Sequence, residues 1–163
     1  MSGQAQTELP SCGLYRTGRS LAGHEEAVPA GALIYFHNHS DQGPPLVLAA
    51  TTNTNNKWTF SDRGWLAEDA GFVRELIPLK REGLYVVSGR HLHLNREQIL
   101  PEKSLVQVGY NRRGDTILFP AKFEANGIQF PERGFRFESP DVLQQLVGVN
   151  FVVPKAKAER VLH

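Results

Sequence analysis

Short apolar runs alternate with polar stretches along the whole chain, and the polar stretches are rich in Gly, Pro and Asn. Short runs dominated by β-branched and aromatic residues and bounded by turn residues predict β-strands. The predicted strands fall at residues 13–15, 32–36, 46–49, 64–66, 83–87, 105–108, 116–119 and 134–137. Together with hairpin strands between them, this pattern predicts about ten short strands, mostly antiparallel.

Turn and cap residues separate these strands. Asn126-Gly127 lies between alternating residues and predicts a tight hairpin, because both residue types tolerate positive φ. Asn55-Asn56 occupies the same place in the first half, in a loop that we expect to be two residues longer. Ser139 followed by Pro140 predicts the start of a short helix, and Asp69 predicts another.

The same order of elements occurs twice, at a spacing of about 70 residues. The matching segments are 13–15 with 83–85, 25–29 with 97–101, 43–50 with 114–121 and 60–65 with 130–135. The spacing changes only within turn-rich connections, as expected when two copies share strands and differ in loops. An internal duplication is therefore predicted. The alternative is the weak self-similarity of any strand-rich chain.

The predicted fold class is α+β, mostly antiparallel β, with two tandem pseudo-symmetric β-rich units that each end in a short helix. The predicted parts are a flexible leader at 1–12, unit 1 at 13–82, unit 2 at 83–153 and a tail at 154–163. Residues 150–153 resemble the strand at 85–87 and are expected to close a sheet. The sequence leaves open whether the units form two small barrels, one continuous sheet or a single compact domain.

Composition argues against several classes of function. The 18 Lys and Arg residues balance 17 Asp and Glu residues, so a net charge of +1 lacks the surplus typical of nucleic-acid coats and polybasic membrane anchors. No apolar run approaches the ~20 residues that span a bilayer. Cys12 is the only cysteine, which excludes an internal disulfide and favours a cytoplasmic protein.

Two histidine pairs carry the sharpest candidate chemistry. His37 and His39 lie two residues apart, and so do His91 and His93. Residues two apart on a strand share a face, so each pair is able to share a metal ion. Four imidazoles from neighbouring strands would suit zinc, which is therefore the candidate cofactor. Neither pair has a counterpart in the other unit, which favours the alternative of surface or turn histidines.

The string His-Asn-His-Ser at 37–40 resembles the metal motif of JAB/MPN-type isopeptidases and RadC-like proteins. In that family a Ser and an Asp ligand follow the second histidine, at positions that Val47 and Ala50 occupy here. The resemblance covers only these few residues and lacks the third ligand. It implies an alternative function, a metal-dependent hydrolase that uses His37 and His39 in unit 1 only.

An Arg-Gly pair precedes the last predicted strand of each unit. The repeated positions are Arg63, Gly64 and Glu68 in unit 1, and Arg133, Gly134 and Glu138 in unit 2. An arginine beside an aromatic strand is able to present its guanidinium to an acidic ligand. Because both units keep the pair, we favour a structural role. The arginine would bond carbonyls or the nearby glutamate, and the glycine would supply unusual backbone angles.

Four residues are candidates for contact with a protein partner: Trp58, Trp65, Arg112 and Arg113. Partly exposed tryptophans anchor many interfaces, although the alternative is that they fill the core. The two arginines form the most basic loop, but the balanced charge argues against nucleic acid as the partner. We expect a small soluble binding or scaffold protein that engages a protein partner, or its own copy, through loops and a sheet edge. The repeat does not duplicate any acid, base or ligand residues, which disfavours an enzyme.

Overall fold

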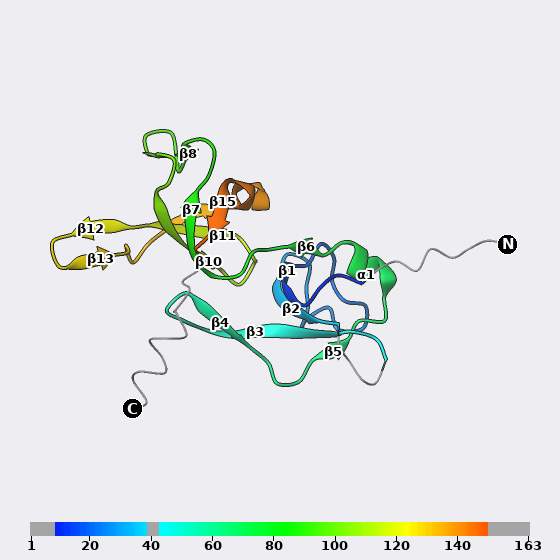
Figure 1. Cartoon of the computed structure of the whole chain (residues 1–163). Helices are drawn as coiled ribbons and strands as arrows, with labels where there is room; N and C mark the ends of the chain where they lie inside the picture. The colour runs from blue at the N-terminus through cyan, green and yellow to red at the C-terminus, as the bar shows by residue number, and fades with distance from the viewer. Residues whose placement is uncertain (1–8, 39–42, 150–163) are drawn as a thin grey trace, which may run out of the picture.

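The computed structural model describes residues 9–38 and 43–149. The strands form two larger antiparallel sheets and two small two-stranded sheets, with little helix (Figure 1). The mostly antiparallel, β-rich part of the predicted fold class is therefore confirmed, with fifteen strands in this part of the chain where about ten were expected. The alternative of one continuous sheet is wrong. Within the described ranges, no helix has the length and apolar character needed to cross a membrane.

Some predicted features lie outside the described residues. They are most of the leader at 1–12, His39 of the first histidine pair, the closing strand at 150–153 and the tail at 154–163.

The first sheet is built from the first half of the chain. Its strands are β1 (Gly13–Arg16), β2 (Leu33–His37), β3 (Leu46–Thr54), β4 (Lys57–Phe60), β5 (Trp65–Leu66) and β6 (Ile77–Pro78). Their order is β4-β3-β2-β1-β6, and β5 pairs with β3. The last strand thus returns to pair with the first, which brings the two ends of this segment together.

The second sheet is built from the second half. Its strands are β7 (Gly83–Val87), β10 (Leu105–Tyr110), β11 (Thr116–Pro120), β14 (Phe135–Phe137) and β15 (Leu146–Gly148). Their order is β14-β11-β10-β7-β15, so the last strand again pairs with the first. The small sheets are β8 (Leu92–His93) with β9 (Ile99–Leu100), and β12 (Lys122–Glu124) with β13 (Gly127–Gln129).

A short helix precedes the last strand of each sheet. Helix α1 (Ala70–Arg74) follows Asp69, and the 3₁₀ helix η1 (Pro140–Gln145) follows Ser139. Each capping side chain accepts a hydrogen bond from a backbone N–H in the first turn, so both predicted caps are confirmed. The prediction that each unit ends in its helix is wrong, because β6 and β15 follow the helices and pair with β1 and β7.

The hairpin of β3 and β4 closes with a two-residue turn. Thr54 pairs with Lys57, so Asn55-Asn56 forms the turn, and both asparagines have positive φ, as a tight hairpin of this type requires. The expected longer loop is wrong. A bulge between Ala50 and Thr52 accommodates the extra length of this hairpin within the strand.

The hairpin of β12 and β13 also has a two-residue turn. Glu124 pairs with Gly127, so the turn is Ala125-Asn126, one residue earlier than predicted. Gly127 opens the returning strand with a φ of 138°. The prediction of a hairpin here is confirmed, while its register is corrected by one residue.

Two clusters of buried side chains form the core. One lies entirely within the first half of the chain and is centred on Phe36, Val47 and Phe72, none of which is exposed. The other contains buried residues of the second sheet together with Leu14 and Leu33 of the first. The two sheets therefore share one core cluster and pack directly against each other.

Candidate functional site

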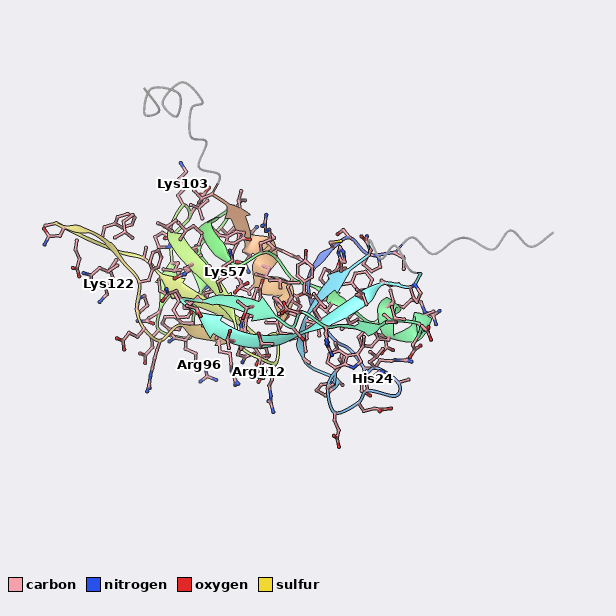
Figure 2. The ribbon with its side chains drawn as sticks, turned by 90° about the horizontal axis from the view of Figure 1, so that it is seen from below. His24, Lys57, Arg96, Lys103, Arg112 and Lys122 are labelled. Atoms are coloured by element: carbon pink, nitrogen blue, oxygen red, sulfur yellow. The ribbon has the colours of Figure 1, made fainter. Side chains whose placement is uncertain are left out.

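The hairpin of β3 and β4 reaches from the first sheet to the second (Figures 1 and 2). Trp58 donates from Nε1 to the Tyr110 carbonyl oxygen at 2.7 Å. The Arg112 guanidinium lies 5.1 Å from the centre of the Trp58 ring and donates to the carbonyl oxygens of Ala50 and Thr51. A guanidinium over an indole face is attractive. Trp58 and Arg112, two predicted partner-binding residues, thus hold the junction between the sheets.

A buried carboxylate adds to this junction. Asp115, 7% exposed, lies 3.6 Å from Nη1 of Arg16 in β1 and 3.8 Å from Nη1 of Arg136. Arg16 also donates to the Glu138 carbonyl oxygen at 2.6 Å. A buried charge is tolerated when it is paired. Arg16 therefore ties β1 of the first sheet to the second sheet.

A groove of about 900 Å³ lies at the junction and is partly open to solvent. The first residues of β1 and β7, Gly13-Leu14 and Gly83-Leu84, both line it. Aromatic side chains from both halves of the chain form much of its wall: Tyr35, Trp58, Phe60 and Tyr85. The rings of Tyr35 and Phe60 lie 5.7 Å apart in a tilted contact. The groove therefore offers aromatic surface that neither sheet presents alone.

Charged groups from both halves of the chain accompany the aromatic rings. Lys57, Arg81 and Glu82 line the groove. The Glu82 carboxylate accepts a hydrogen bond from the backbone N–H of Trp58 at 2.7 Å. Burial raises the pKa of Glu82, and this hydrogen bond and the charge of Lys57 act in the opposite direction. A half-buried carboxylate beside aromatic rings is suited to a basic group on a ligand.

Two tyrosine hydroxyls fix the backbone next to the groove. The Tyr85 hydroxyl donates to the Arg81 carbonyl oxygen, and the Tyr110 hydroxyl donates to the Lys80 carbonyl oxygen. Burial raises the pKa of both phenols. Both side chains therefore stay neutral and serve as hydrogen-bond donors that hold the segment entering β7.

Of the four predicted partner-binding residues, only Trp58 lines the groove; Arg112, Trp65 and Arg113 do not. Trp65 packs against the first core cluster, with its ring centre 5.9 Å from that of His24. Arg113 is exposed in the turn between β10 and β11, where its backbone N–H donates to the Asn111 side chain. The structure therefore does not bring the four predicted residues together at one surface.

The repeated glycines Gly64 and Gly134 are required by close packing. A Cβ on Gly64 would lie 2.7 Å from the Val47 carbonyl oxygen, and one on Gly134 would lie 2.7 Å from that of Leu118. Neither glycine has positive φ. The structural role is supported, but the expected reason of unusual backbone angles is wrong.

The repeated arginines do not contact the glutamates as expected. Glu138 lies 3.5 Å from Nη2 of Arg136 rather than pairing with Arg133. Arg63, Glu68 and Arg133 have exposed side chains without an ion pair within the described ranges. Exposed charges of this kind contribute little to folding.

His37 and His93 lie in different sheets, in β2 and β8. His37 in β2 has Nδ1 3.5 Å from Cys12 Sγ, whereas the rings of His91 and His93 contact each other, 5.3 Å apart. His39 lies outside the described residues. Among the residues that are described, no three or more His, Cys, Asp or Glu side chains gather to hold a metal ion. His37 therefore does not join His91 and His93, and zinc binding by either pair stays a prediction.

The positions at which the isopeptidase-like motif would have its Ser and its Asp ligand serve the core. Val47 is fully buried in β3, and Ala50 is 9% exposed. Their burial gives these positions a packing role, so the resemblance at 37–40 does not extend into the fold.

Sequence reasoning did not single out the groove residues Tyr35, Phe60, Tyr85 and Glu82. One signal was present in the repeat itself. Glu82 precedes the Gly-Leu-Tyr that opens the second predicted unit, where Cys12 precedes the first, so a carboxylate appears at this position in one unit only. The other groove residues looked like ordinary strand aromatics.

Comparison with protein-family models, curated proteins and solved structures finds no match for this chain.

Proposed function

We propose that this chain is a non-enzymatic binding protein built from two copies of one β-rich unit, residues 13–82 and 83–153, and that the groove at their junction receives a segment of a partner protein. The proposal keeps the expected cytoplasmic setting, which the single cysteine favours.

The strand registers support the duplication. Gly13 pairs with Phe36 in the first sheet, and Gly83 pairs with Val108 in the second, at offsets of 70 and 72. Val47 pairs with Trp65, and Leu118 pairs with Phe135, at offsets of 71 and 70. These are the offsets at which the sequence repeats. A one-residue slip would turn every side chain to the opposite face, so agreement in several strand pairs is informative.

Details outside the strands support the same equivalence. Gly31 and Lys103, 72 residues apart, both have positive φ, of 68° and 69°. Their N–H groups donate to the carbonyl oxygens of Thr17 and Val87, which are 70 residues apart. The hydroxyl of Tyr15 donates to a carbonyl oxygen four residues earlier, as that of Tyr85 does. Lysine is rarely found at positive φ, so its presence there supports a backbone conformation that the two units share.

The observation that carries the binding function is the aromatic wall of the groove. Four rings, drawn from both copies, line a groove that is partly open to solvent. Small ligands usually bury most of their surface in enclosed pockets, whereas extended peptides lie in open grooves. Aromatic-lined grooves suit proline-containing segments, because these are already extended and lose little entropy on binding.

The charges of the groove specify the ligand further. Glu82 is half-buried beside the aromatic wall, and among the described residues its charge is met by the backbone N–H of Trp58 and the charge of Lys57. A basic side chain of the ligand would form a charge-assisted hydrogen bond with it. The proposed ligand is therefore an extended, proline-containing segment of a partner protein that carries a basic residue.

Tryptophan emission tests this proposal. In Trp65→Phe, Trp58 is the only remaining tryptophan, and its emission reports on the groove. We expect saturable changes when this variant is titrated with proline-containing peptides that carry arginine. Peptides of the same length and charge in which alanine replaces proline are expected to bind more weakly.

Two further variants test the aromatic wall and the carboxylate of the groove. Tyr35→Ala removes part of the aromatic wall and is expected to weaken binding by about tenfold or more. Glu82→Gln is expected to weaken binding of arginine peptides and to leave their neutral analogues unchanged. Circular dichroism would establish that both variants are folded. Equal affinity for all peptides, or no response of Trp58 to any of them, would overturn the proposal.

A further inference from the structure

The hairpin of β12 and β13 projects from the second sheet (Figure 1). It carries exposed apolar side chains. Phe123 and Ile128 are cross-strand partners and are 71% and 51% exposed. All residues of both strands are exposed. An isolated two-stranded hairpin is marginally stable in water, and exposed large apolar residues that lie together indicate an interaction surface.

The equivalent hairpin of the first copy is docked on the second sheet. Trp58 lies 70 residues before Ile128 and is bonded to the Tyr110 carbonyl oxygen. At the tip, the Asn56 amide lies 3.4 Å from the Gln107 side chain. Figure 2 shows Lys57, at the start of β4, against the body of the molecule, and Lys122, at the start of β12, on the arm that extends from it.

The tip of the docked hairpin covers one face of β10. A Cβ built on Gly109 would lie 3.3 Å from Cβ of Asn56 and 3.4 Å from the Phe119 ring. Gly109 is buried, and Phe119 is only 5% exposed. The side chain of Gln107 points to the same face as Gly109, because the two are separated by two residues on one strand. This face of the second sheet therefore has an occupant within the chain.

The equivalent face of the first sheet is more open. At an offset of 72, Tyr35 and His37 of β2 take the places of Gln107 and Gly109. Their partners on β3 are Leu48 and Leu46, which are partly exposed, and Leu66 beside them in β5 is 45% exposed. Leu48 takes the place of the buried Phe119 at an offset of 71. An apolar face that is covered in the second copy is thus incompletely covered in the first.

The chain therefore has an exposed hairpin at one copy and a matching open face at the other. We propose that the β12–β13 hairpin of one molecule docks on the face formed by β2, β3 and β5 of a second molecule, and so repeats between chains the contact that joins the two copies within one chain. This proposal rests on the proposed duplication. The occupant is a second copy of this chain because the internal junction already shows how such a hairpin and such a face fit.

The proposed contact joins two different surfaces. A contact of this kind is heterologous, so association continues from chain to chain unless the rotation closes a ring. The near-neutral net charge of +1 places no strong repulsion between copies. We therefore expect a series of oligomers of increasing size rather than a closed dimer.

Sedimentation equilibrium of the full chain tests the inference. We expect the average mass to rise with protein concentration beyond that of a dimer. Ile128→Asp places a charge on the hairpin and Leu66→Asp places one on the face, and each is expected to raise the concentration for half-association by about tenfold or more. Val147→Asp, at an apolar site on β15 that is 52% exposed and outside both surfaces, is the control. It is expected to leave association unchanged.

Mixing the two defective variants gives the sharpest result. The Ile128→Asp chain keeps an intact face and the Leu66→Asp chain keeps an intact hairpin, so their mixture should form a complex that stops at two chains. Loss of association in Ile128→Asp alone, with Leu66→Asp unaffected, would overturn the head-to-tail contact. A wild-type chain that stays monomeric at all concentrations, or an equal effect of Val147→Asp, would also overturn it.

Peptide binding by the groove is measured on Ile128→Asp with Trp65→Phe, a chain that does not self-associate through its hairpin. Binding there with no assembly of the wild type would reject only the head-to-tail contact. Assembly of the wild type with no peptide binding would reject only the groove function.

Discussion

The two hairpins of the molecule have turns of the same length and opposite surroundings. The β3–β4 hairpin carries Trp58 and lies on the second sheet, where Arg112 and the Tyr110 carbonyl oxygen hold the indole. The β12–β13 hairpin carries Ile128 at the corresponding position and is exposed along both strands. Hairpins with turns of the same length therefore serve as the fixed part of a junction in one half of the chain and as a free arm in the other. The surroundings decide the role, because a hairpin alone buries too little surface to hold its position.

Matched truncations of the two hairpins should show the largest difference. Trp58→Ala removes a large ring, its hydrogen bond and its contact with Arg112, so we expect the free energy of unfolding to fall by about 2–4 kcal/mol. Ile128→Ala, at the equivalent exposed position, is expected to change it by less than about 0.5 kcal/mol. Chemical denaturation followed by circular dichroism measures both at a concentration where the chain is monomeric. Similar losses in the two variants would contradict the comparison.

The repeated glycines test where the two copies are alike. In both Gly64→Ala and Gly134→Ala the new Cβ would meet a carbonyl oxygen at 2.7 Å, so each should lower the free energy of unfolding by about 1–3 kcal/mol. Gly148→Ala is the control, because its Cβ would be 3.6 Å from the Tyr85 ring, an ordinary contact. A large loss in only one of the two repeated positions would show that the copies are packed differently at this corner.

The substitution Glu82→Gln is expected to have the smallest effect on the free energy of unfolding. Glu82 has no counterpart in the first half of the chain. Burial raises the folded-state pKa of Glu82 above its ordinary value of 4.5, so the folded chain binds this proton more tightly than the unfolded chain. Its contribution therefore favours folding below that value and is lost as the pH rises through the folded pKa. Glu82→Gln should remove this decline, measured as the difference in unfolding free energy between variant and wild type from pH 4 to 8. A difference that does not change with pH would contradict the assignment.

Much of the local structure follows from local residues. Asp69 and Ser139 cap helices because each side chain accepts a bond from an N–H two residues on. Asn55-Asn56 forms a turn because asparagine tolerates positive φ. The short strands β6 and β15 were not predicted, because two or three residues carry no pattern of their own. They are strands only through pairing with β1 and β7.

The candidate site was much less accessible to sequence reasoning. The sequence analysis named Trp58 and Arg112 as two parts of an outer surface, whereas in the structure their side chains contact each other. Glu82 contacts Trp58 across 24 residues, and the Arg112 side chain reaches Ala50 across 62. No periodicity or spacing encodes contacts of that range, since they arise when two separate sheets pack.

The β-rich class, most strand positions, both helix caps and a repeat spacing that the strand registers match could all be predicted from the amino-acid sequence. These features depend on neighbouring residues or on comparing the chain with itself. The packing of the two sheets, in contrast, establishes which hairpin is docked and which projects, and it brings the two halves of the chain together around an aromatic groove. The physical reason is that burial depends on what lies opposite a surface, and the opposite surface here comes from the other half of the chain.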